Sequence, residues 1–474
     1  MHMNHLSNSC RYLTMAGITF LILQLGGCAA VGPDYRPEPP AHPAGWSTTE
    51  STHYAQEQEL AHWWRLFNDP VLNQLVDSAL LHNQDLAIAR QRLLQARAER
   101  ERSAGLLEPE INAGAETTTA QWSTKLDNAP TPARSKTYRL GLEASWEIDV
   151  FGGRRRSLEA ADAQVQAVEN DGRAILVSLL AELADDYAAL RTTQQRLSIA
   201  QDNLAALTTA ERLAVKAYSH GLGTAAEVAQ ARAEREINQA RVPEFAGEAE
   251  RLMHAIGVLI GDFPATQRGM LNRQEAALTV PPALPLSLPS EVVRRRPDIR
   301  AAERRLAAAN AGIGVAIAAD FPRFTIPLGL DTTASLLHQL FSAQSFAWVL
   351  SGSVQQSVYN GGKNNAAVQE ARAEAEAQRL IYQQQVHLAF RDVENALSGL
   401  RTERLRHAAL SAAERDSRVA LTRATRLYRQ GLSGYLPVLT AQRSAYQTRD
   451  ALALNQLNDV QAMIGLYKAL GAGW

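Results

Sequence analysis

The chain has 474 residues and a formal net charge of −1, with 48 lysines and arginines against 49 aspartates and glutamates. This balance gives no electrostatic reason to expect a nucleic-acid partner. The length would allow two or three ordinary globular domains. One of the two cysteines, Cys10, lies in the expected leader, so the mature chain would form no internal disulfide.

Residues 1–27 are interpreted as the signal peptide of a lipoprotein. Arg11 is the only lysine or arginine ahead of an apolar run over residues 18–25, and two glycines separate that run from Cys28. Lipoprotein signal peptidase requires small residues before its cysteine, so Cys28 is expected to carry lipid after cleavage. The next residue is alanine and not aspartate, which by analogy with enteric bacteria favours the outer membrane. The alternative is a plain secretory signal in which Cys28 is incidental.

The mature chain falls into a tether and two copies of one pattern. Residues 28–62 are polar and Pro-rich and are expected to form an extended, lipidated N-terminal tether. A first structural repeat over 63–261 is followed by a Pro-rich surface linker at 262–290 and a second repeat over 291–474. Residues Asp85, Ala89, Leu93, Ala96, Ala98 and Pro109 recur 213 positions later as Asp298, Ala302, Leu306, Ala309, Ala311 and Pro322. Such a duplication predicts pseudo-symmetric construction in space.

Each repeat begins with helical spacing and then changes to strands. From Trp63 to about Gly105 the apolar residues recur at helical spacing, with a break into two helices at Asn83. Residues 138–150 then alternate strictly between apolar and polar side chains, which predicts a strand. A weaker partner strand covers 110–121.

The second repeat shows a matching pair of strands. Residues 324–331 alternate, and 346–358 continue the pattern in a fourth strand. A globular sandwich would show the same alternation. Lengths of ten or more residues, with aromatic residues toward the ends, favour the wall of a membrane barrel.

Four strands are too few to close a barrel, because about eight is the minimum. No mature segment has the roughly 18 uncharged apolar residues of a membrane helix, so a membrane crossing must use strands. Open sheet edges are not tolerated in lipid, which means that several chains must share the barrel. Three copies would supply twelve strands. Strand counting also permits a dimer, but not a monomer.

Very long helices are expected after each Gly-Gly corner. Residues 154–219 contain no proline and one glycine, as do residues 363–430. At 1.5 Å per residue each could approach roughly 100 Å. Leu176, Leu183, Leu190, Leu197 and Leu204 keep a seven-residue spacing that Val386, Val393 and Leu400 repeat. This spacing is typical of a coiled-coil seam.

Each long helix should turn back at a glycine. Gly221 and Gly431 are expected to be C-terminal caps, followed by shorter return helices. Pro243 and Pro437 fall in these return helices and predict kinks or breaks.

At this point the residues match a known family. The motifs are Val31-Gly32-Pro33-Asp34-Tyr35, Trp63-Trp64, Ser145-Trp146-Glu147-Ile148-Asp149 with Phe151-Gly152, Arg295-Arg296-Pro297-Asp298-Ile299-Arg300, and Tyr467-Lys468-Ala469-Leu470-Gly471 with Trp474. The ordered set resembles the outer membrane efflux protein family, in its lipoprotein branch. That branch includes the outer-membrane channels of resistance-nodulation-division (RND) pumps.

The resemblance implies an α+β membrane protein that forms a homotrimer. Twelve strands, four from each chain, would form a β-barrel in the outer membrane, continued by a long α-helical barrel through the periplasm. The implied function is passive export of drugs or other small molecules, handed over by an inner-membrane transporter, expected to be of the RND type, and a periplasmic adaptor. No cofactor, metal or enzymatic step is implied.

Two other functions compete with this expectation. One is an outer-membrane channel for type I protein secretion, which would have the same architecture and a different inner-membrane partner. The other is a structural coiled-coil lipoprotein that only spans the periplasm. Catalysis has little support, because Gly312-Ile313-Gly314 lacks the third glycine of a dinucleotide loop and the histidines form no HExxH motif.

Candidate gate residues lie where the helical hairpins turn, at 219–227 and 430–439. Glu227 occupies a position where the family commonly has aspartate, and a threefold ring of carboxylates there would attract cations and raise the pKa of each member. Thr440 and Ser433 are neutral, so the second repeat departs from this pattern.

Aromatic and basic residues give the gate a second candidate mechanism. Tyr428 and Arg429 would bridge neighbouring hairpins when the tube is closed, with Tyr218 as the pseudo-symmetric partner. The alternative is that both tyrosines simply pack at the tips.

The basic run at Arg294, Arg295 and Arg296 is interpreted as structural. Pro297 suits the first position of a helix, and Asp298 complements the positive end of the helix dipole.

Overall fold

The computed structural model describes residues 30–37, 40–47, 53–54, 60–123, 125, 134–273, 275–281, 285–286 and 289–474. The signal peptide and Cys28 lie outside these residues. The chain divides into two compact units. The strand unit is Met1–Glu38, Leu93–Val168 and Ala302–Tyr382, and the helical unit is Pro39–Arg92, Glu169–Ala301 and Gln383–Trp474. Each unit therefore takes segments from both repeats.

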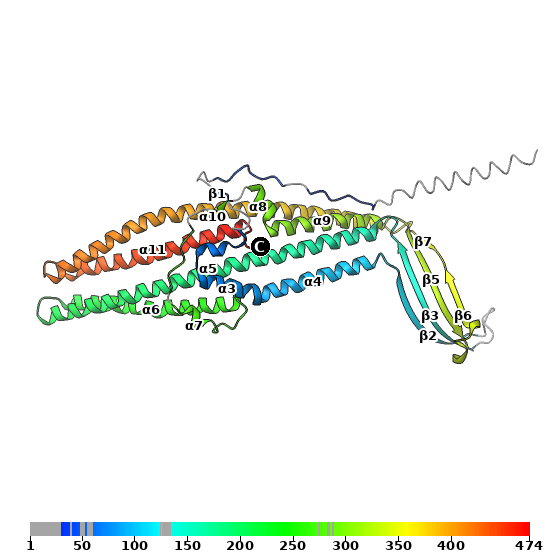
Figure 1. Cartoon of the computed structure of the whole chain (residues 1–474), viewed down its shortest axis with the longest axis horizontal. Helices are drawn as coiled ribbons and strands as arrows, with labels where there is room; N and C mark the ends of the chain where they lie inside the picture. Colours follow the sequence, from blue (N-terminus) through cyan, green and yellow to red (C-terminus); the bar gives the residue numbers. More distant parts are fainter. Residues whose placement is uncertain are drawn as a thin grey trace, which may run out of the picture. The chain divides into compact units, whose positions relative to one another are not determined.

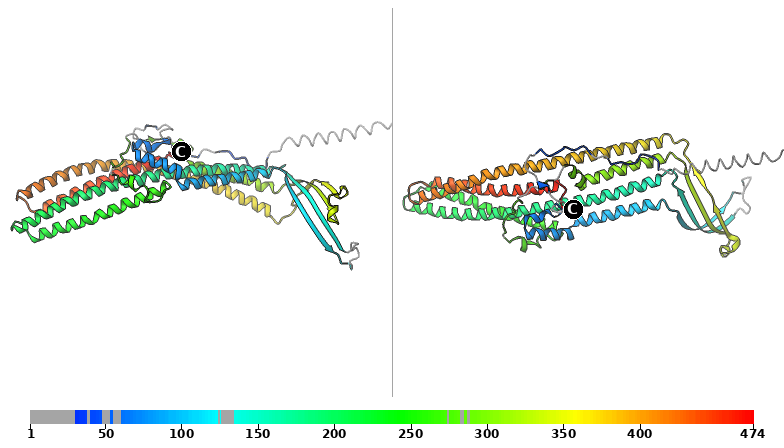
Figure 2. Two further views of the ribbon diagram at one scale, coloured as in Figure 1. Left: turned by 60° about the horizontal axis from the view of Figure 1, so that its bottom comes forward. Right: turned by 45° about the horizontal axis from the view of Figure 1, so that its top comes forward.

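The strand unit contains one antiparallel sheet (Figures 1 and 2). Its strands are β2 (Glu110–Gln121), β3 (Arg134–Ile148), β5 (Arg323–Ala334), β6 (Phe346–Leu350) and β7 (Ser353–Gln355). The order is β2-β3-β5-β6, and β7 also pairs with β5. In the described part of the chain, β2 therefore forms one edge of the sheet, and β6 and β7 form the other.

The expected fourth strand is not continuous, which corrects the prediction for residues 346–358. The break at residues 351–352 separates β6 from β7. Ser351 donates its amide to the carbonyl of Pro327 in β5 at 3.1 Å. Pro327 has no N–H to return to a partner strand, and Gly352 favours a local bend. The alternation of side chains did not reveal this interruption.

The register places apolar and polar side chains on opposite faces of the sheet. Leu142 lies opposite Leu330, and Leu330 lies opposite Trp348. The exposed large apolar side chains on one face of the sheet are Ile111, Leu140, Leu142, Trp146, Leu330, Phe346, Trp348, Leu350 and Val354, whereas exposed Val349 lies on the other face. On the polar face Arg139 forms an ion pair with Asp331 at 3.0 Å. A sheet with one exposed and mostly apolar face favours an apolar environment on that side.

Two helical hairpins follow the strands, as the sequence predicts. The long helices α5 (Gly153–Ser219) and α10 (Lys363–Arg429) each have 67 residues, and the return helices α6 (Ala225–Leu259) and α11 (Tyr435–Ala469) each have 35. Figure 1 shows each return helix beside its long helix. Gly221 and Gly431 adopt φ values of +68° and +72°, which confirms them as left-handed caps.

The prolines do not break the return helices, so the expected breaks are wrong, whereas a kink stays a prediction. Helix α6 continues through Pro243. Helix α11 begins at Tyr435, which places Pro437 in its first turn. The first backbone N–H groups of a helix have no intrahelical partner, so Pro437 removes no hydrogen bond there.

The helical unit is built around a large apolar core. Short helices η1 (Trp63–Phe67) and α3 (Pro70–His82) pack against α5, α6 and α11, with α4 (Gln84–Gly105) continuing the first repeat. Trp63 stacks on Tyr467 with ring centroids 5.0 Å apart. Five of the eight predicted seam residues are buried, namely Leu183, Leu190, Val386, Val393 and Leu400, and the other three, Leu176, Leu197 and Leu204, are partly buried.

The linker at 262–290 is more ordered than a surface connection, which corrects that expectation. It contains α7 (Arg268–Leu271) and β4 (Pro285–Leu286), and β4 pairs in parallel with β1 (His53–Tyr54). Leu271 is fully buried in the core of the helical unit. The prolines disguised this burial, because they interrupt any periodic pattern.

The basic run near the start of the second repeat has the structural role predicted for it. Helix α8 (Pro289–Arg295) ends in this run, and α9 (Pro297–Ala318) begins at Pro297. Arg296 forms an ion pair with Asp298 at 2.7 Å and donates to the carbonyl of Ala469 at 3.1 Å.

None of the helices in the described residues has an 18-residue stretch apolar enough to cross a bilayer.

An acidic cluster on α5 predicts a pH-dependent stability. Burial, with smaller contributions from Asp186 and Glu182, raises the pKa of Asp185 to about 7 although Lys468 lowers it. A raised pKa means that ionising Asp185 disfavours the folded state, so stability falls as pH rises from about 4 to 7. We expect Asp185→Asn to raise the thermal midpoint at pH 8, and the gain to shrink steadily as the pH is lowered to 4. A gain that does not change with pH would contradict this assignment.

Candidate functional site

The two hairpin turns of the helical unit lie side by side and border an open cavity of about 440 Å³. One turn joins α5 to α6 and the other joins α10 to α11. The cavity is lined by Leu213, Lys216, Ala217, His220, Leu222, Glu227, Tyr428, Arg429, Gly431, Ser433 and Gly434. The structure therefore brings three of the four candidate gate residues, Glu227, Tyr428 and Arg429, to one place.

Glu227 connects the two turns through its carboxylate. It forms a capping box with Thr224: the Glu227 amide donates to Thr224 Oγ1 at 3.2 Å, and the Thr224 amide donates to Glu227 Oε2 at 2.9 Å. Its other oxygen, Oε1, accepts from the backbone amide of Tyr435 at 3.4 Å. Gly434, the N-cap of α11, has no side chain to cap its own helix. Glu227 thus caps its own helix and contacts the start of the neighbouring hairpin's helix.

Tyr428 packs within the chain at the same place. Its ring meets the ring of Tyr435 edge-on, with centroids 5.7 Å apart. Partial burial, and then the negative charge of Glu227, raise the pKa of Tyr428. Packing at the tip, one of the two alternatives for the tyrosines, is therefore what Tyr428 does in the single chain.

The remaining candidates are placed differently. Tyr218 is 52% exposed and does not line the cavity. Arg429 lines the cavity, is exposed, and makes no ion pair with any residue that the structure describes. The positions of Tyr218 and Arg429 within one chain do not test whether they contact a neighbouring chain. The gate assignment therefore stays a prediction.

The sequence analysis missed Tyr435, which is fully buried between the hairpins. Burial raises its pKa to about 12, so its hydroxyl stays neutral. The signal available was its position: it follows the Gly431 turn directly, seven residues after Tyr428, where an aromatic side chain can cover the helix end.

The surroundings of the cavity combine positive charge with exposed apolar surface. Lys216, His220 and Arg429 contribute basic side chains, against the single carboxylate of Glu227. At the tips of the two turns, Leu222 is 85% exposed and Leu432 is 72% exposed.

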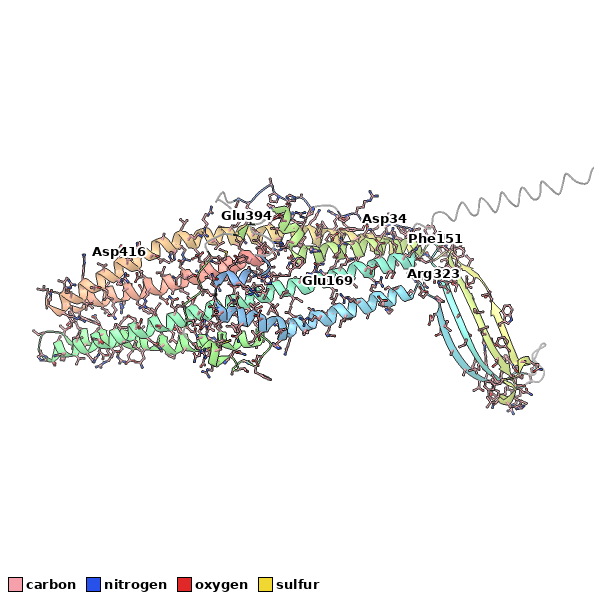
Figure 3. All side chains as sticks on the ribbon, in the orientation of Figure 1. Asp34, Phe151, Glu169, Arg323, Glu394 and Asp416 are labelled. Carbon is pink, nitrogen blue, oxygen red and sulfur yellow. The ribbon has the colours of Figure 1, made fainter. Side chains whose placement is uncertain are left out.

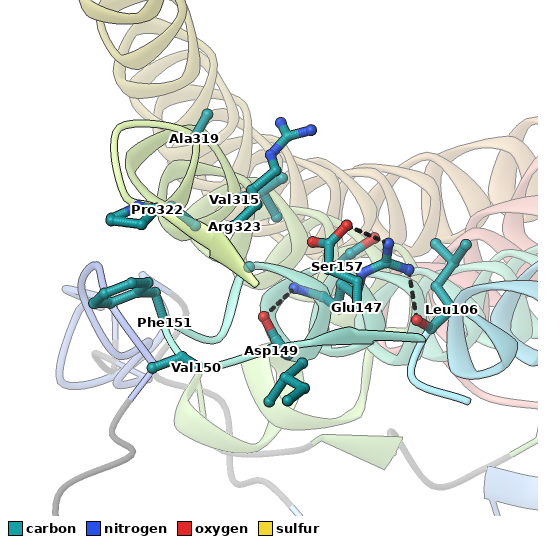
Figure 4. Close-up of a pocket in the computed structure, with 14 residues that line it drawn as sticks. Leu106, Glu147, Asp149, Val150, Phe151, Ser157, Val315, Ala319, Pro322 and Arg323 are labelled. Atoms are coloured by element: carbon teal, nitrogen blue, oxygen red, sulfur yellow. Dashed lines mark hydrogen bonds and ion pairs between the residues drawn. The ribbon is translucent and has the colours of Figure 1, made fainter. Parts of the chain in front are cut away.

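A second cavity, of about 360 Å³, lies in the strand unit where β3 becomes α5 (Figure 4). Arg154 forms an ion pair with Glu147 at 2.7 Å and donates to the carbonyl of Leu106. Asp149 accepts from the backbone amides of Arg154 and Arg155 at 3.1 and 2.8 Å and so caps the start of α5. These charges satisfy one another, which suits a structural junction. In the described residues no three or more His, Cys, Asp or Glu side chains are grouped to hold a metal ion.

The chain is similar to known proteins over nearly its whole length. The sequence profile of the outer membrane efflux protein family matches residues 75–261 and 288–472. The pyoverdine export outer membrane protein OpmQ of Pseudomonas putida is 34% identical over 448 residues, which cover 92% of this chain and 94% of OpmQ. The cation efflux system protein CusC of Escherichia coli is 30% identical over 459 residues, which cover 95% of this chain and 97% of CusC.

A solved structure agrees with these relatives. The outer-membrane channel OprN matches with a TM-score of 0.87 and 36% sequence identity, covering 94% of this chain and 100% of that chain. The fold class predicted from the sequence is therefore confirmed: the chain has the strands and long helices of an outer-membrane channel.

Proposed function

Because the chain belongs to the outer membrane efflux protein family, we propose that it is the outer-membrane duct of a tripartite efflux system. In this function it exports drugs or other small molecules passively. An inner-membrane pump, of the RND type, and a periplasmic adaptor supply the substrate and the energy. The chain itself carries out no chemical step.

The sheet of the strand unit carries this proposal. Its exposed apolar face suits lipid, and its polar face, with the Arg139–Asp331 pair, suits an aqueous lumen. Both edges of the described sheet are open, and an open edge is not tolerated in lipid. Three copies supply twelve strands and close the barrel edge to edge, so the proposed channel is a homotrimer.

The proposed location is the outer membrane, with lipid on Cys28 and the helices extending into the periplasm. The leader ends in small residues before Cys28, as lipoprotein processing requires. A lipid anchor adds to the membrane affinity of the barrel.

For the exported molecules we propose only a broad class, drugs or other small molecules. Relatives of similar identity are named for the export of pyoverdine and for the efflux of cations, which are chemically unlike. That one family of ducts serves such different cargo supports the proposal that the pump selects the substrate. The exposed leucines at the hairpin turns, Leu222 and Leu432, provide an apolar surface for the adaptor.

Disruption of the gene in its own host tests the proposed function. We expect a fluorescent efflux substrate to accumulate several-fold, and plasmid-borne protein to restore its export. Loss of a secreted protein with unchanged dye accumulation would favour the type I secretion channel. Normal export of both would favour the structural lipoprotein.

The candidate gate gives a separate prediction for single-channel recordings. The double variant Tyr428→Phe with Glu227→Gln removes a charged cap and a hydroxyl from the tips, so the closed mouth should loosen. We expect a higher resting conductance in planar bilayers than for the unmodified protein. Arg212→Ala, which removes an exposed arginine of α5, is the matched control and should conduct like the unmodified protein. Unchanged conductance in the double variant would count against this gate.

A further inference from the structure

A short segment ahead of both repeats is bound in a site built for it. We call Ala30–Tyr35 the strap. It lies in the strand unit with the first turns of α5 and with α9, and Figure 3 shows Asp34 of the strap and Phe151 at the strand–helix corner in that unit. The Val31 amide donates to the carbonyl of Phe151 at 3.0 Å. The strap is therefore hydrogen-bonded to the corner from which α5 starts.

Arg156 on α5 is the centre of the binding site. Its side chain is only 5% exposed and forms an ion pair with Asp34 at 2.6 Å and another with Glu159 at 2.7 Å. The same guanidinium donates to three successive strap carbonyls, those of Ala30, Val31 and Gly32, at 3.5, 3.1 and 3.3 Å. A planar group with five donors can satisfy several acceptors at once, so Arg156 recognises the strap by its backbone and by one carboxylate.

Glycines make room for the strap on both sides. A Cβ on Gly152 would lie 2.4 Å from Ala30 Cβ, and a Cβ on Gly314 would lie 2.7 Å from Arg156 Cγ and 2.8 Å from the Val31 carbonyl oxygen. Gly32 of the strap has a φ of +93° and contacts Gly314 directly. The contact is too close for any side chain, so the site fits this segment and no bulkier one.

The other side of the strap is held by α9. Asn310 donates to the carbonyl of Pro33 at 2.9 Å, and the Tyr35 hydroxyl donates to Glu303 at 2.7 Å. Helix α5 belongs to the first repeat and α9 to the second. The strap thus bonds to one helix from each repeat, to the start of α5 in the first and to α9 in the second.

We propose that the strap is a staple that joins the two repeats beside the strand–helix corner, with Arg156 as its positioning residue. In this role the segment holds the fold together, in addition to serving as a tether. Its second consequence rests on the proposed lipidation: Cys28 lies two residues before Ala30, so the docked strap would keep the lipid within roughly 7 Å of its first residue.

Hydrogen exchange and thermal unfolding of the purified protein test the staple without any transport assay. Arg156→Ala removes the central donor, and Gly314→Ala fills the cradle without changing charge. We expect each to speed exchange of the Val31 amide by about tenfold or more and to lower the thermal midpoint. Arg212→Ala should change neither quantity.

A variant that lacks the strap sequence shows whether the two substitutions act by releasing the strap or by disturbing the packing of the helices. Here residues 30–35 are replaced by glycine and serine, and Cys28 is kept. If the substitutions act through the strap, neither Arg156→Ala nor Gly314→Ala lowers the midpoint further in this background. Equal losses in both backgrounds, or unchanged Val31 exchange in the intact strap, would overturn the proposal. Should Arg156→Ala fail to fold, Gly314→Ala decides alone.

Protein made without lipid distinguishes this inference from the proposed function. Cys28→Ala, secreted with an ordinary cleavable leader, should keep slow exchange at Val31, because Arg156 holds the strap and the lipid does not. Fast exchange in this protein would assign the docking to the lipid and overturn the staple.

Discussion

Leu142→Arg is expected to prevent assembly of the protein in the outer membrane, whereas Ser145→Arg is tolerated. Leu142 is exposed on the apolar face of β3, between Ala113 of β2 and Leu330 of β5. An arginine facing lipid near the middle of a barrel strand costs about 2–4 kcal/mol, and a trimer would bear this cost three times. The measurement is the fraction of protein recovered from outer membranes as a heat-resistant oligomer.

The control variant adds the same side chain on the other face of the same strand. Ser145 is exposed, lies opposite Glu110 in the register, and shares its face with Glu143 and Glu147. Carboxylates are available there to pair with the new guanidinium. Equal loss of oligomer in both variants would show that β3 tolerates no arginine on either face, and the assignment of a lipid face would fail.

Arg191→Leu is expected to destabilise the helical unit by about 3–5 kcal/mol, because it breaks a buried charged network and leaves its partners unpaired. The Arg191 side chain is fully buried and donates to the Tyr187 hydroxyl at 3.0 Å and to the carbonyls of Leu271 and Arg273 at 3.2 and 2.6 Å. Tyr187 in turn donates to Asp69 at 2.9 Å. Loss of Arg191 therefore disturbs the linker and the start of α3 together.

Thermal unfolding in detergent measures this effect, with Arg212→Ala as the control for loss of an arginine from the same helix. The buried network reaches the start of α3 through Asp69, which caps this helix by accepting from the amides of Val71 and Leu72. The Arg191→Leu midpoint should fall by several degrees, while the control stays within a degree or so. Equal midpoints for the two variants would mean that the network contributes little to stability.

Local patterns in the sequence predicted the regular elements closely. The alternation of apolar and polar residues placed β2 at residues 110–121. The absence of proline located both long helices to within a residue or two. Pro297 and Asp298 marked the start of α9 correctly. The positions of these strands and helices depend on residues that are close together in the sequence. One sequence is therefore enough to predict them.

Features that depend on contacts distant in the sequence escaped prediction. The break between β6 and β7 arises where Pro327 of another strand cannot donate, and Leu271 is buried by helices far from the linker. Arg156 reads as one more basic residue at a helix start, although it binds the strap more than 120 residues earlier. Pro243 was misjudged because helix propensity is weak beside the packing of a long hairpin.

The proximity of three candidate gate residues was predicted, whereas their role as a gate stays a prediction. Glu227, Tyr428 and Arg429 do meet at the tips, because the duplication aligned the two turns. The cap that Glu227 provides to the second hairpin and the burial of Tyr435 required the tertiary structure. Gly434 is the reason: without a side chain at that N-cap, α11 receives its acceptor from the other hairpin.

Native mass spectrometry of the protein extracted gently from outer membranes measures how many chains share one barrel. A barrel shared edge to edge by three chains predicts a single species with the mass of three mature chains, which falls apart only when the sheet unfolds. A folded monomer under the same conditions would contradict the account, because the described sheet has two open edges and an exposed apolar face that one chain cannot cover.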